Sequence, residues 1–362
     1  MKTCWCFIAS RTVPVTVTHA MQQVLVTASR DPRPKERIYE NKPETRRTQI
    51  LTEIRSRNAR IELADAANGP AAIDLYVKLG ITTADKMDFL KTVHAAWKAA
   101  PCPEPSFQSS ETAEKDGIIP NLFVRDRPHP TAPWARRMAY HSNCVLTPIY
   151  DNTAEVLADD AAVCAHAVEM ILAGRSAAYA LTTHPGHHAF ADFYGGFCFL
   201  NHAAFAFSRL RQAGKKPFLI DVDYHAGDGT ASFLSSRDMV SLHALNDYPY
   251  TPLDCPYAIF TPPDTAWEGY EPLLREALSR RPPETDVLVL SLGFDTQDGD
   301  PCAAEGHRLR LQPEDFAKMR AVINETGLQL IVTQEGGYLM SSVHKAAAEF
   351  WLAGEMAAPA IS

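Results

Sequence analysis

The sequence predicts an α/β fold: a doubly wound, mostly parallel sheet with helices on both faces. From residue 153 onward, short apolar runs alternate with amphipathic helical segments, a pattern typical of strand–helix–strand units. The runs Pro217–Val222 and Asp286–Gly293 are almost continuously apolar, as expected for central strands covered on both faces. We therefore expect residues 1–362 to form a single domain, with a long loop excursion at about residues 101–140.

The individual elements follow from apolar spacing and from residues that begin or end helices. Gly174 and Gly214 end two helical segments, Thr82 or Thr83 is the expected N-cap of another, and Pro313 occupies the first turn of a fourth. Helices are expected at 48–58, 82–100, 153–174, 199–212, 270–280, 313–326 and 341–356, and strands at 3–9, 23–28, 179–183, 217–222, 238–242, 286–293 and 328–333.

Composition narrows the class of protein. Hydrophobic residues make up 46% of the chain, which supports a sizeable core, and the net charge of −8 without a basic stripe argues against nucleic-acid binding and favours cationic or neutral substrates. The eight cysteines include no Cys-x-x-Cys pair, so a reducing, cytoplasmic location is expected. The first 11 residues are too short and interrupted for a signal peptide, and no apolar run approaches the length of a membrane span.

A candidate metal site follows two of the predicted strands. Asp223 and His225 come just after the strand 217–222, and Asp295 follows the strand 286–293. Two carboxylates and one imidazole make three protein ligands and leave a position open for water or substrate, as in catalytic metal sites. An isolated Asp-x-His pair is more often a helix cap or part of an ordinary loop. Here the flanking Asp221 and Asp228 and the distant Asp295 favour a metal.

Two adjacent histidines, His187 and His188, lie in a Pro-Gly turn after the strand 179–183. Alone they are equally consistent with a surface turn. Beside a metal, one neutral imidazole is a suitable general base and the other can orient or protonate the leaving amine. Each imidazole needs an orienting carboxylate, and Asp221 and Asp228 are the candidates.

A phenol and several aromatic side chains complete the candidate site. Tyr338 follows Gly336 and Gly337 after the last strand and can donate a hydrogen bond to an oxyanion, although a tyrosine that caps the core is the commoner case. The remaining candidates would wall a narrow substrate channel, with core packing as the alternative for the aromatic ones: Tyr194, Gly196, Phe197, Tyr250, Gly336 and Gly337.

Taken together, these segments resemble the zinc-dependent histone deacetylase superfamily, and most of all its bacterial acetylpolyamine amidohydrolase branch. The resemblance covers residues 150–350 and becomes faint before residue 100, where YENKPETRR is similar to an early Pro-Glu-x-x-Arg segment of the family. It rests on PGHH at 185–188, GFCFLN at 196–201, DVDYHAGDGT at 221–230, SLGFD at 291–295 and EGGY at 335–338.

The resemblance implies a role for each matching residue. Asp223, His225 and Asp295 would bind Zn²⁺, with Fe²⁺ or Co²⁺ also compatible with such ligands. His188 would be the general base and His187 the electrostatic partner or acid. Asp221 and Asp228 would orient the two histidines, Tyr338 would polarise the substrate carbonyl, and Phe197 and Tyr250 would flank the tunnel. A structural K⁺ would lie near His225 and take oxygen atoms from Asp221, Asp223, Ser241 and Leu242.

The chain also departs from the family pattern. His184 stands in the segment where the family has Arg-Pro-Pro-Gly, His202 replaces a common asparagine, and Ala226 replaces a second histidine. The 101–140 loop falls where polyamine-deacetylating relatives have a dimer loop, so a homodimer is expected, and Glu104 and neighbouring acidic residues could meet a cationic substrate there.

The expected activity is metal-dependent hydrolysis of an N-acyl amine such as an acetylpolyamine or acetyl-lysine. Three alternatives remain at this point: an amidase for another small-molecule or xenobiotic amide, an arginase-like dimanganese hydrolase, and a catalytically silent module that binds acylated peptides. Thr296 and Gln297 argue against an arginase-like hydrolase, because they occupy the positions after Asp295 where a second metal ion would need carboxylate ligands.

Overall fold

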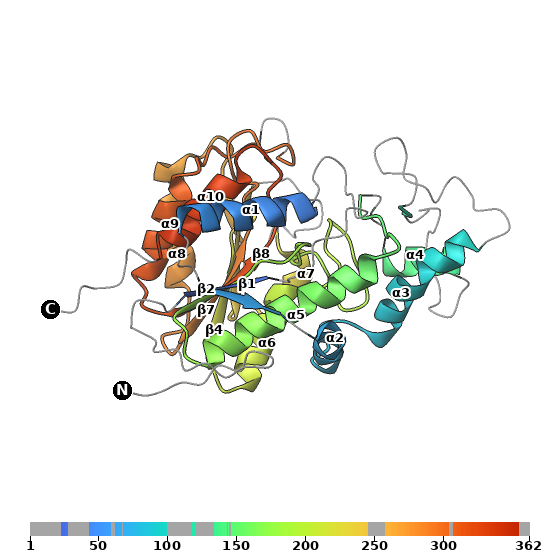
Figure 1. Cartoon of the computed structure of the whole chain (residues 1–362). Coiled ribbons are helices and arrows are strands. Elements are labelled where there is room, and N and C mark those ends of the chain that lie inside the picture. The colour runs from blue at the N-terminus through green and yellow to red at the C-terminus, as the bar shows by residue number, and fades with distance from the viewer. Residues whose placement is uncertain are drawn as a thin grey trace.

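The protein is built around one eight-stranded sheet in which every strand pair is parallel. The strand order is β2-β1-β3-β8-β7-β4-β5-β6. Figure 1 shows this sheet with helices packed around it. The computed structural model describes residues 23–27, 43–58, 62–66, 68–99, 117–119, 134–142, 144, 146–244, 258–303 and 307–354. The predicted α/β class with a parallel sheet is confirmed.

The strands are β1 (Gln23–Thr27), β2 (Glu62–Asp65), β3 (Ala177–Ala180), β4 (Pro217–Asp221), β5 (Met239–Ala244), β6 (Ala258–Thr261), β7 (Val287–Leu292) and β8 (Gln329–Gln334). The helices are α1 (Pro43–Arg57), α2 (Gly69–Lys78), α3 (Ala84–Lys98), α4 (Trp134–His141), α5 (Thr153–Leu172), α6 (His202–Gln212), α7 (Asp228–Ala231), α8 (Trp267–Ser279), α9 (Asp315–Asn324) and α10 (Val343–Leu352).

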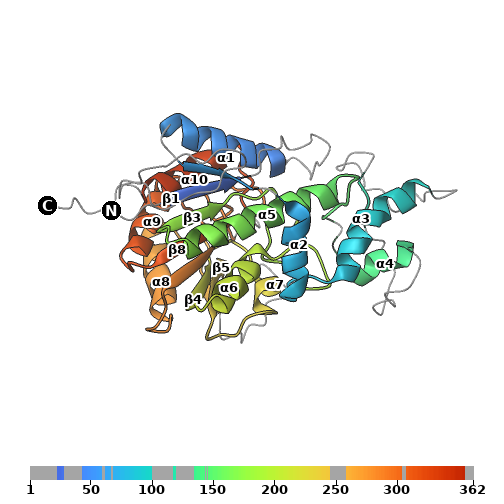
Figure 2. The same cartoon turned by 60° about the horizontal axis from the view of Figure 1, so that its bottom comes forward.

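Helices cover both faces of the sheet because the central strands are apolar on both sides. In β4, Phe218 and Ile220 belong to one hydrophobic cluster and Leu219 to the other, so alternate side chains point to opposite faces of the sheet. Helices α1, α8, α9 and α10 pack on the first face, and α2, α5 and α6 on the second (Figure 2). Helices α3 and α4 extend beyond the end of the sheet in both views (Figures 1 and 2).

The observed elements correct several predicted boundaries. Helix α6 begins at His202 and not at residue 199, because the side chain of Asn201 caps it by accepting the N–H of Ala204 at 2.8 Å. Strand β3 ends at Ala180, before the predicted 183, and Thr83 is the N-cap of α3 as expected. The sequence reading did not predict β2, β6, α2, α4 or α7.

Some expectations lie outside the described residues. These are the strand at 3–9, Tyr250, and most of the 101–140 excursion, including Glu104. The single-domain organisation and the dimer contact through that excursion therefore stay predictions.

The fold brings four strand ends together. Strands β3, β8, β7 and β4 are consecutive neighbours in the sheet, and all run in the same direction. The segments after them carry the candidate histidines, Tyr338, Asp295 and Asp223, in that order. Because the carboxyl ends of parallel strands meet at one edge, these segments share a single rim, which is where ligands bind in open α/β sheets.

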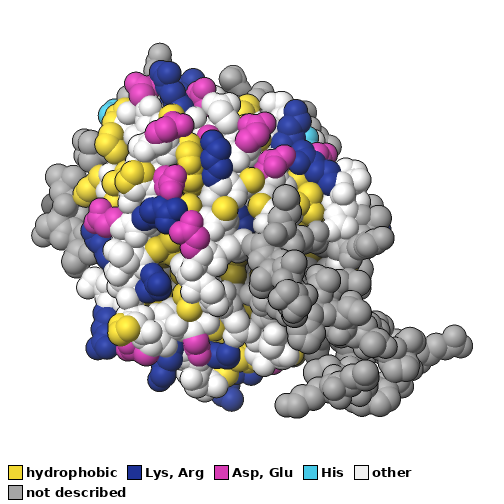
Figure 3. All heavy atoms as spheres, turned by 90° about the vertical axis from the view of Figure 1, so that its left-hand side faces the viewer, with side chains coloured by type: hydrophobic (Ala, Val, Ile, Leu, Met, Phe, Trp, Pro, Cys, Tyr) yellow, Lys and Arg dark blue, Asp and Glu magenta, His cyan; other side chains and the backbone are white. Residues whose placement is uncertain are grey.

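The surface over α8 and α9 mixes charges of both signs. Figure 3 shows acidic and basic side chains interspersed on the described part of this face, and exposed ion pairs such as Arg275–Glu325 and Arg280–Glu276 join them. Such exposed pairs contribute little to stability. Within the described part of the chain, no helix combines the length and apolar character needed to cross a membrane.

Candidate metal centre and active site

Asp223, His225 and Asp295 converge just beyond the ends of β4 and β7. His225 Nδ1 lies 3.3 Å from Asp223 Oδ1 and 3.2 Å from Asp295 Oδ2. One ligand atom from each of the three residues lies within 4.8 Å of the others. Both carboxylates are buried, and their backbone surroundings hold them in place: the N–H of Tyr224 donates to Asp295 Oδ1 at 2.9 Å and the N–H of Gly336 donates to Asp223 Oδ2 at 2.7 Å.

Two observations show that these residues fit a cation. Asp295 Oδ2 is buried and accepts no hydrogen bond, and a Cβ on Gly336 would lie 2.4 Å from this oxygen and 2.7 Å from Asp223 Oδ2, so only glycine leaves the space open. The site is also electrostatically negative. Burial and Asp223 raise the pKa of Asp295 to about 7, and the two carboxylates outweigh burial to raise the pKa of His225 to about 10.

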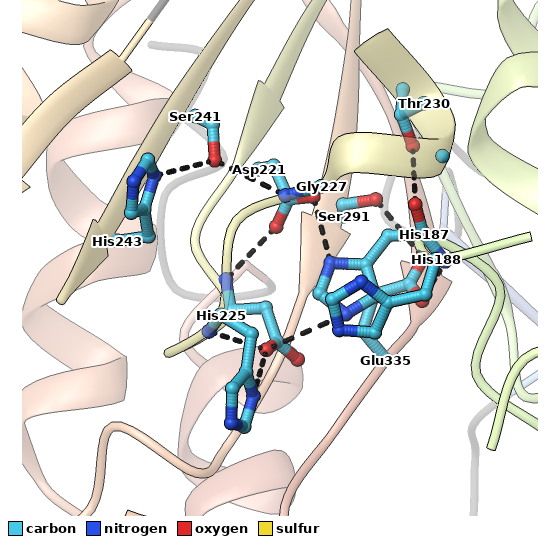
Figure 4. Close-up of polar contacts among 12 residues, drawn as sticks. His187, His188, Asp221, His225, Gly227, Thr230, Ser241, His243, Ser291 and Glu335 are labelled. Carbon is cyan, nitrogen blue, oxygen red and sulfur yellow. Dashed lines mark hydrogen bonds and ion pairs between the residues drawn. The ribbon is translucent and has the colours of Figure 1, made fainter. Parts of the chain in front are cut away.

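The two adjacent histidines are each paired with a different carboxylate. His187 Nδ1 donates to Asp221 Oδ2 at 3.0 Å (Figure 4). His188 Nδ1 donates to Asp228 Oδ1 at 2.6 Å. Since a carboxylate only accepts, both rings carry hydrogen on Nδ1, and Nε2 is the position at which each can gain or lose a proton. The His187 Nε2 atom lies 3.6 Å from Asp223 Oδ1, at the edge of the three-residue cluster.

Opposite pKa shifts distinguish the two rings. Burial lowers the pKa of His187, but Asp223 and Asp221 outweigh it and raise the pKa well above its ordinary value. For His188, burial and the neighbouring His187 lower the pKa below its ordinary value. In the metal-free chain these shifts favour the cationic form of His187 and the neutral form of His188. A pair of titratable groups driven apart in this way is suited to separate acid and base roles.

Glu335 holds the turn that carries the two histidines through hydrogen bonds. Its Oε2 accepts the backbone N–H groups of Gly186 at 2.6 Å and His187 at 3.0 Å. Its Oε1 accepts the hydroxyl groups of Ser291 at 3.0 Å and Thr333 at 3.1 Å. Burial raises the pKa of this fully buried carboxyl to about 7.

His187, Cys198 and Glu335 form a second cluster of ligand-type atoms, but its chemistry does not suit a metal. Burial raises the pKa of the Cys198 thiol well above its ordinary value, so no thiolate is present at neutral pH. Both Glu335 oxygens already accept two hydrogen bonds each. Among the described residues, the cluster of Asp223, His225 and Asp295 is therefore the better metal site.

Comparison with known proteins places this geometry in a family. Residues 80–353 match the histone deacetylase domain, which is well over half of the chain. The chain belongs to the histone deacetylase family. An acetylpolyamine amidohydrolase of Mycoplana ramosa is 30% identical over 297 residues, covering 76% of this chain and 82% of the relative. One of Burkholderia pseudomallei is 29% identical over 330 residues, covering 84% and 92%.

A solved structure supports the fold of this deacetylase-family chain. The crystal structure of acetylpolyamine aminohydrolase from Burkholderia pseudomallei aligns with a TM-score of 0.77, at 24% sequence identity, over 92% of this chain and 98% of that one. At this identity the likeness shows the fold alone. It agrees with the eight parallel strands described above.

Tyr338 faces the same rim of the deacetylase fold. It is 8% exposed, and its ring centroid lies 5.5 Å from that of Phe197. Asp300 Oδ2 accepts the backbone N–H of Tyr338 at 2.7 Å and that of Leu339 at 2.9 Å, so a buried carboxylate sets the start of this segment. Burial raises the pKa of the Tyr338 phenol well above its ordinary value, which keeps the hydroxyl protonated as a hydrogen-bond donor.

Arg46 connects the tyrosine segment to the histidine turn. Its buried guanidinium donates to the carbonyl oxygens of Thr183 at 3.2 Å and Gly337 at 3.3 Å, and lies over the Tyr338 ring. The Pro-Glu-x-x-Arg segment identified in the sequence ends at Arg47, and the neighbouring Arg46 reaches the site.

The predicted channel residues are found in two environments. Phe197 is partly exposed and has a φ of 67°, in the region that favours glycine. A Cβ on the preceding Gly196 would lie 2.5 Å from His188 Cδ2, so this loop passes directly over the histidine. Tyr194 is instead fully buried in the hydrophobic core and stacks on Phe199 with 5.1 Å between ring centroids.

Three of the predicted potassium ligands, Asp221, Ser241 and Leu242, lie on the neighbouring strands β4 and β5. Asp221 at the end of β4 is in register with Ser241 of β5, and Leu242 follows. The Ser241 hydroxyl lies 3.0 Å from His243 Nδ1 and accepts the N–H of Gly227 at 3.4 Å. Figure 4 shows Asp221 and Ser241 of this set in the same close-up as His225.

Sequence reasoning assigned no role to Glu335, Asp300 or Arg46. Glu335 was visible as a carboxylate after a buried strand, the same signal that identified Asp223. Asp300 lies in a polar loop five residues after Asp295, where its role depends on the path of the chain. Arg46 is 137 residues from Thr183, and only the folded chain brings the two together.

Glu335→Gln is expected to remove a pH-dependent loss of stability. The pKa of Glu335 is 4.5 ordinarily and about 7 in the folded protein, so the folded state binds more protons between these values. The wild-type free energy of unfolding should therefore fall as pH rises through this window, by on the order of 1–3 kcal/mol. The glutamine keeps an oxygen for the turn amides and offers its NH₂ to the two hydroxyls.

Denaturant unfolding of chelator-treated protein between pH 4.5 and 8 measures this effect as the difference between wild type and variant. Glu284→Gln, which changes an exposed carboxylate, is the matched control and should follow the wild type. Parallel curves for wild type and Glu335→Gln would contradict the expectation.

Proposed function

We propose that this chain is a metal-dependent amidohydrolase that removes the acyl group from an N-acyl amine, such as an acetylpolyamine or acetyl-lysine. The observation that carries the proposal is the meeting of Asp223, His225 and Asp295 with the two carboxylate-paired histidines at one rim of the sheet. Membership in the histone deacetylase family supports hydrolysis of an acylated amine. The names of the relatives support a small polyamine substrate.

Asp223, His225 and Asp295 would hold the catalytic metal, with Zn²⁺ proposed and Fe²⁺ or Co²⁺ compatible with the same donors. Bound there, the metal would polarise the substrate carbonyl and make water more acidic. A structural K⁺ is proposed at the oxygen atoms of Asp221, Asp223, Ser241 and Leu242, near His225.

The side chains around the metal site divide the proton transfers. His188 is neutral, and its Nε2 accepts a proton from the attacking water while Asp228 holds the ring through Nδ1. His187, held by Asp221 through Nδ1, is the electrostatic partner that stabilises negative charge in the transition state. Either ring can then protonate the departing amine. The Tyr338 hydroxyl donates a hydrogen bond to the developing oxyanion.

A turnover panel tests the proposal. The full chain loaded with Zn²⁺ is expected to hydrolyse at least one of acetylputrescine, acetylspermidine and an acetyl-lysine peptide, and a chelator should abolish this turnover. Restoring Zn²⁺ should recover it. Release of the free amine is measured by mass spectrometry, with chelated protein as the control.

The same panel separates the alternatives. Chelator-sensitive turnover confined to other small amides would indicate an amidase with a different substrate. No turnover of any amide, combined with binding of acetylated peptides, would contradict the proposal and indicate a catalytically silent binding module. Single-domain organisation, a homodimer and a cytoplasmic location remain part of the proposal.

A further inference from the structure

The turn that carries the two histidines is held by two buried carboxylates, Asp160 and Glu335. Asp160 accepts the backbone N–H groups of Thr183 at 2.6 Å and His184 at 3.0 Å. Glu335 accepts those of Gly186 and His187, and residue 185 is a proline without an N–H. Every backbone N–H from Thr183 to His187 therefore donates to a carboxylate, an arrangement that leaves the turn little freedom to shift.

Asp160 holds the turn through a side chain as well as through the backbone. It comes from α5, is fully buried, and its Oδ2 lies 2.9 Å from His184 Nδ1. Burial alone would raise the pKa of Asp160, but the contact with His184 outweighs burial and lowers it. Asp160 thus stays ionised at neutral pH and makes three charge-assisted contacts to two consecutive residues of the turn.

The far side of the turn rests against the start of α6. A Cβ on Gly186 would lie 2.6 Å from the carbonyl oxygen of Leu200 and 2.8 Å from the backbone nitrogen of His202, so the two segments are in direct contact. The His202 ring is buried, and its Nδ1 lies 2.8 Å from the Tyr76 hydroxyl of α2. Burial lowers the pKa of His202 to about 4, so the ring is neutral at neutral pH and supports the turn by packing alone.

We propose that Asp160 and His184 are positioning residues that set the placement of the catalytic turn and thereby of His188 over the metal site. The inference rests on the proposed function, since it assigns His188 as the base. Neither residue is placed among the groups that contact the substrate. The two sequence departures at positions 184 and 202 then have a physical role: they belong to the contacts that support this turn from α5 and α6.

Asp160→Asn should lower kcat while leaving KM nearly unchanged. The amide nitrogen of asparagine would face at least one of the N–H donors that the carboxylate now accepts, so the turn must move. A displacement of about 1 Å at a proton-transferring ring costs about 10- to 100-fold in kcat. Zinc content should match the wild type, because Asp160 has no contact with Asp223, His225 or Asp295 among the interactions of the described residues.

The control is Glu169→Gln, the same chemical change on the same helix at an exposed ion pair with Arg209. It should retain wild-type kcat. Hydrogen–deuterium exchange of a peptide spanning residues 181–190 gives a second measure that does not depend on activity. Exchange in this peptide should be faster in Asp160→Asn and unchanged in Glu169→Gln.

His184→Gln provides a milder test should Asp160→Asn fail to fold. It keeps both backbone contacts to Asp160 and removes the imidazole, so a smaller loss of kcat with unchanged KM is expected. Wild-type kcat and wild-type exchange in either folded variant would overturn the positioning role. A wild-type protein inactive on every amide would instead refute the proposed function, and the exchange measurement would still decide whether Asp160 holds the turn.

Discussion

His188→Ala is expected to lower kcat by about 10²- to 10⁴-fold, the range for removal of a positioned general base. The residue is well placed for this role because burial and the cationic His187 lower its pKa and Asp228 fixes the hydrogen on Nδ1. Zinc content should be unchanged, since the ring lies beside the three-residue cluster and is not part of it. Single-turnover kinetics with the best substrate of the panel measures the effect.

A double-variant experiment tests whether Asp228 acts through His188. Asp228→Asn should weaken the same step by removing the carboxylate that orients His188, and its effect should be small when His188 is already alanine, because the two residues act as a unit. Full turnover by His188→Ala would exclude this ring as the base. Additive losses in the double variant would show that Asp228 acts independently of His188.

Asp295→Asn is expected to abolish stabilisation by Zn²⁺ and, with it, turnover. The carboxylate is the proposed ligand from the segment after β7, and its buried Oδ2 lies 3.2 Å from His225 Nδ1 within the cluster. At zinc concentrations about 100 times Kd, the wild type should gain about 2.7 kcal/mol, seen as a rise in Tm. The variant should show no rise, and its zinc content by elemental analysis should be close to zero.

Without metal, the Asp295→Asn variant should be at least as stable as the wild type, whereas with Zn²⁺ the wild type should be the more stable protein. Burial and Asp223 raise the pKa of Asp295 to about 7, so the ionised side chain destabilises the folded chain at pH 8, and the neutral asparagine removes that cost. Chelated Asp295→Asn should therefore be at least as stable as chelated wild type. Lower stability of the chelated variant would contradict the raised pKa of Asp295, and an equal response of both proteins to Zn²⁺ would contradict its assignment as a ligand.

Particular residues show which features of the site and fold could be predicted from the sequence alone. Asp223, His225 and Asp295 follow continuous apolar runs, and in a parallel sheet the ends of such runs meet at one edge, so their convergence was predictable. The Asn201 cap that begins α6 was not recognised, and α2 and β2 were missed. In the short strand β2, the side chains of Glu62, Leu63 and Ala64 are partly or largely exposed, and the strand character comes from pairing with β1.

The supporting residues around the site depended on the folded chain. Arg46 hydrogen-bonds to Thr183, which lies 137 positions away in the sequence. Asp160 contacts His184, 24 positions away, and Asp300 contacts Tyr338, 38 positions away. No local pattern marks these side chains, because each is defined by the partner that packing brings to it. Tyr194 illustrates the same point, since an aromatic residue next to a glycine pair suits a channel wall or a core equally well until its neighbours are known.

By itself, the amino-acid sequence determined the α/β class, the order of the main elements and the set of polar groups at the strand ends, because periodicity and apolar runs are local properties. The tertiary structure alone decided which carboxylate pairs with which histidine, and therefore which ring is neutral and which is cationic. Those pKa shifts depend on burial and on charges from other strands, and both exist only once β3, β8, β7 and β4 lie side by side.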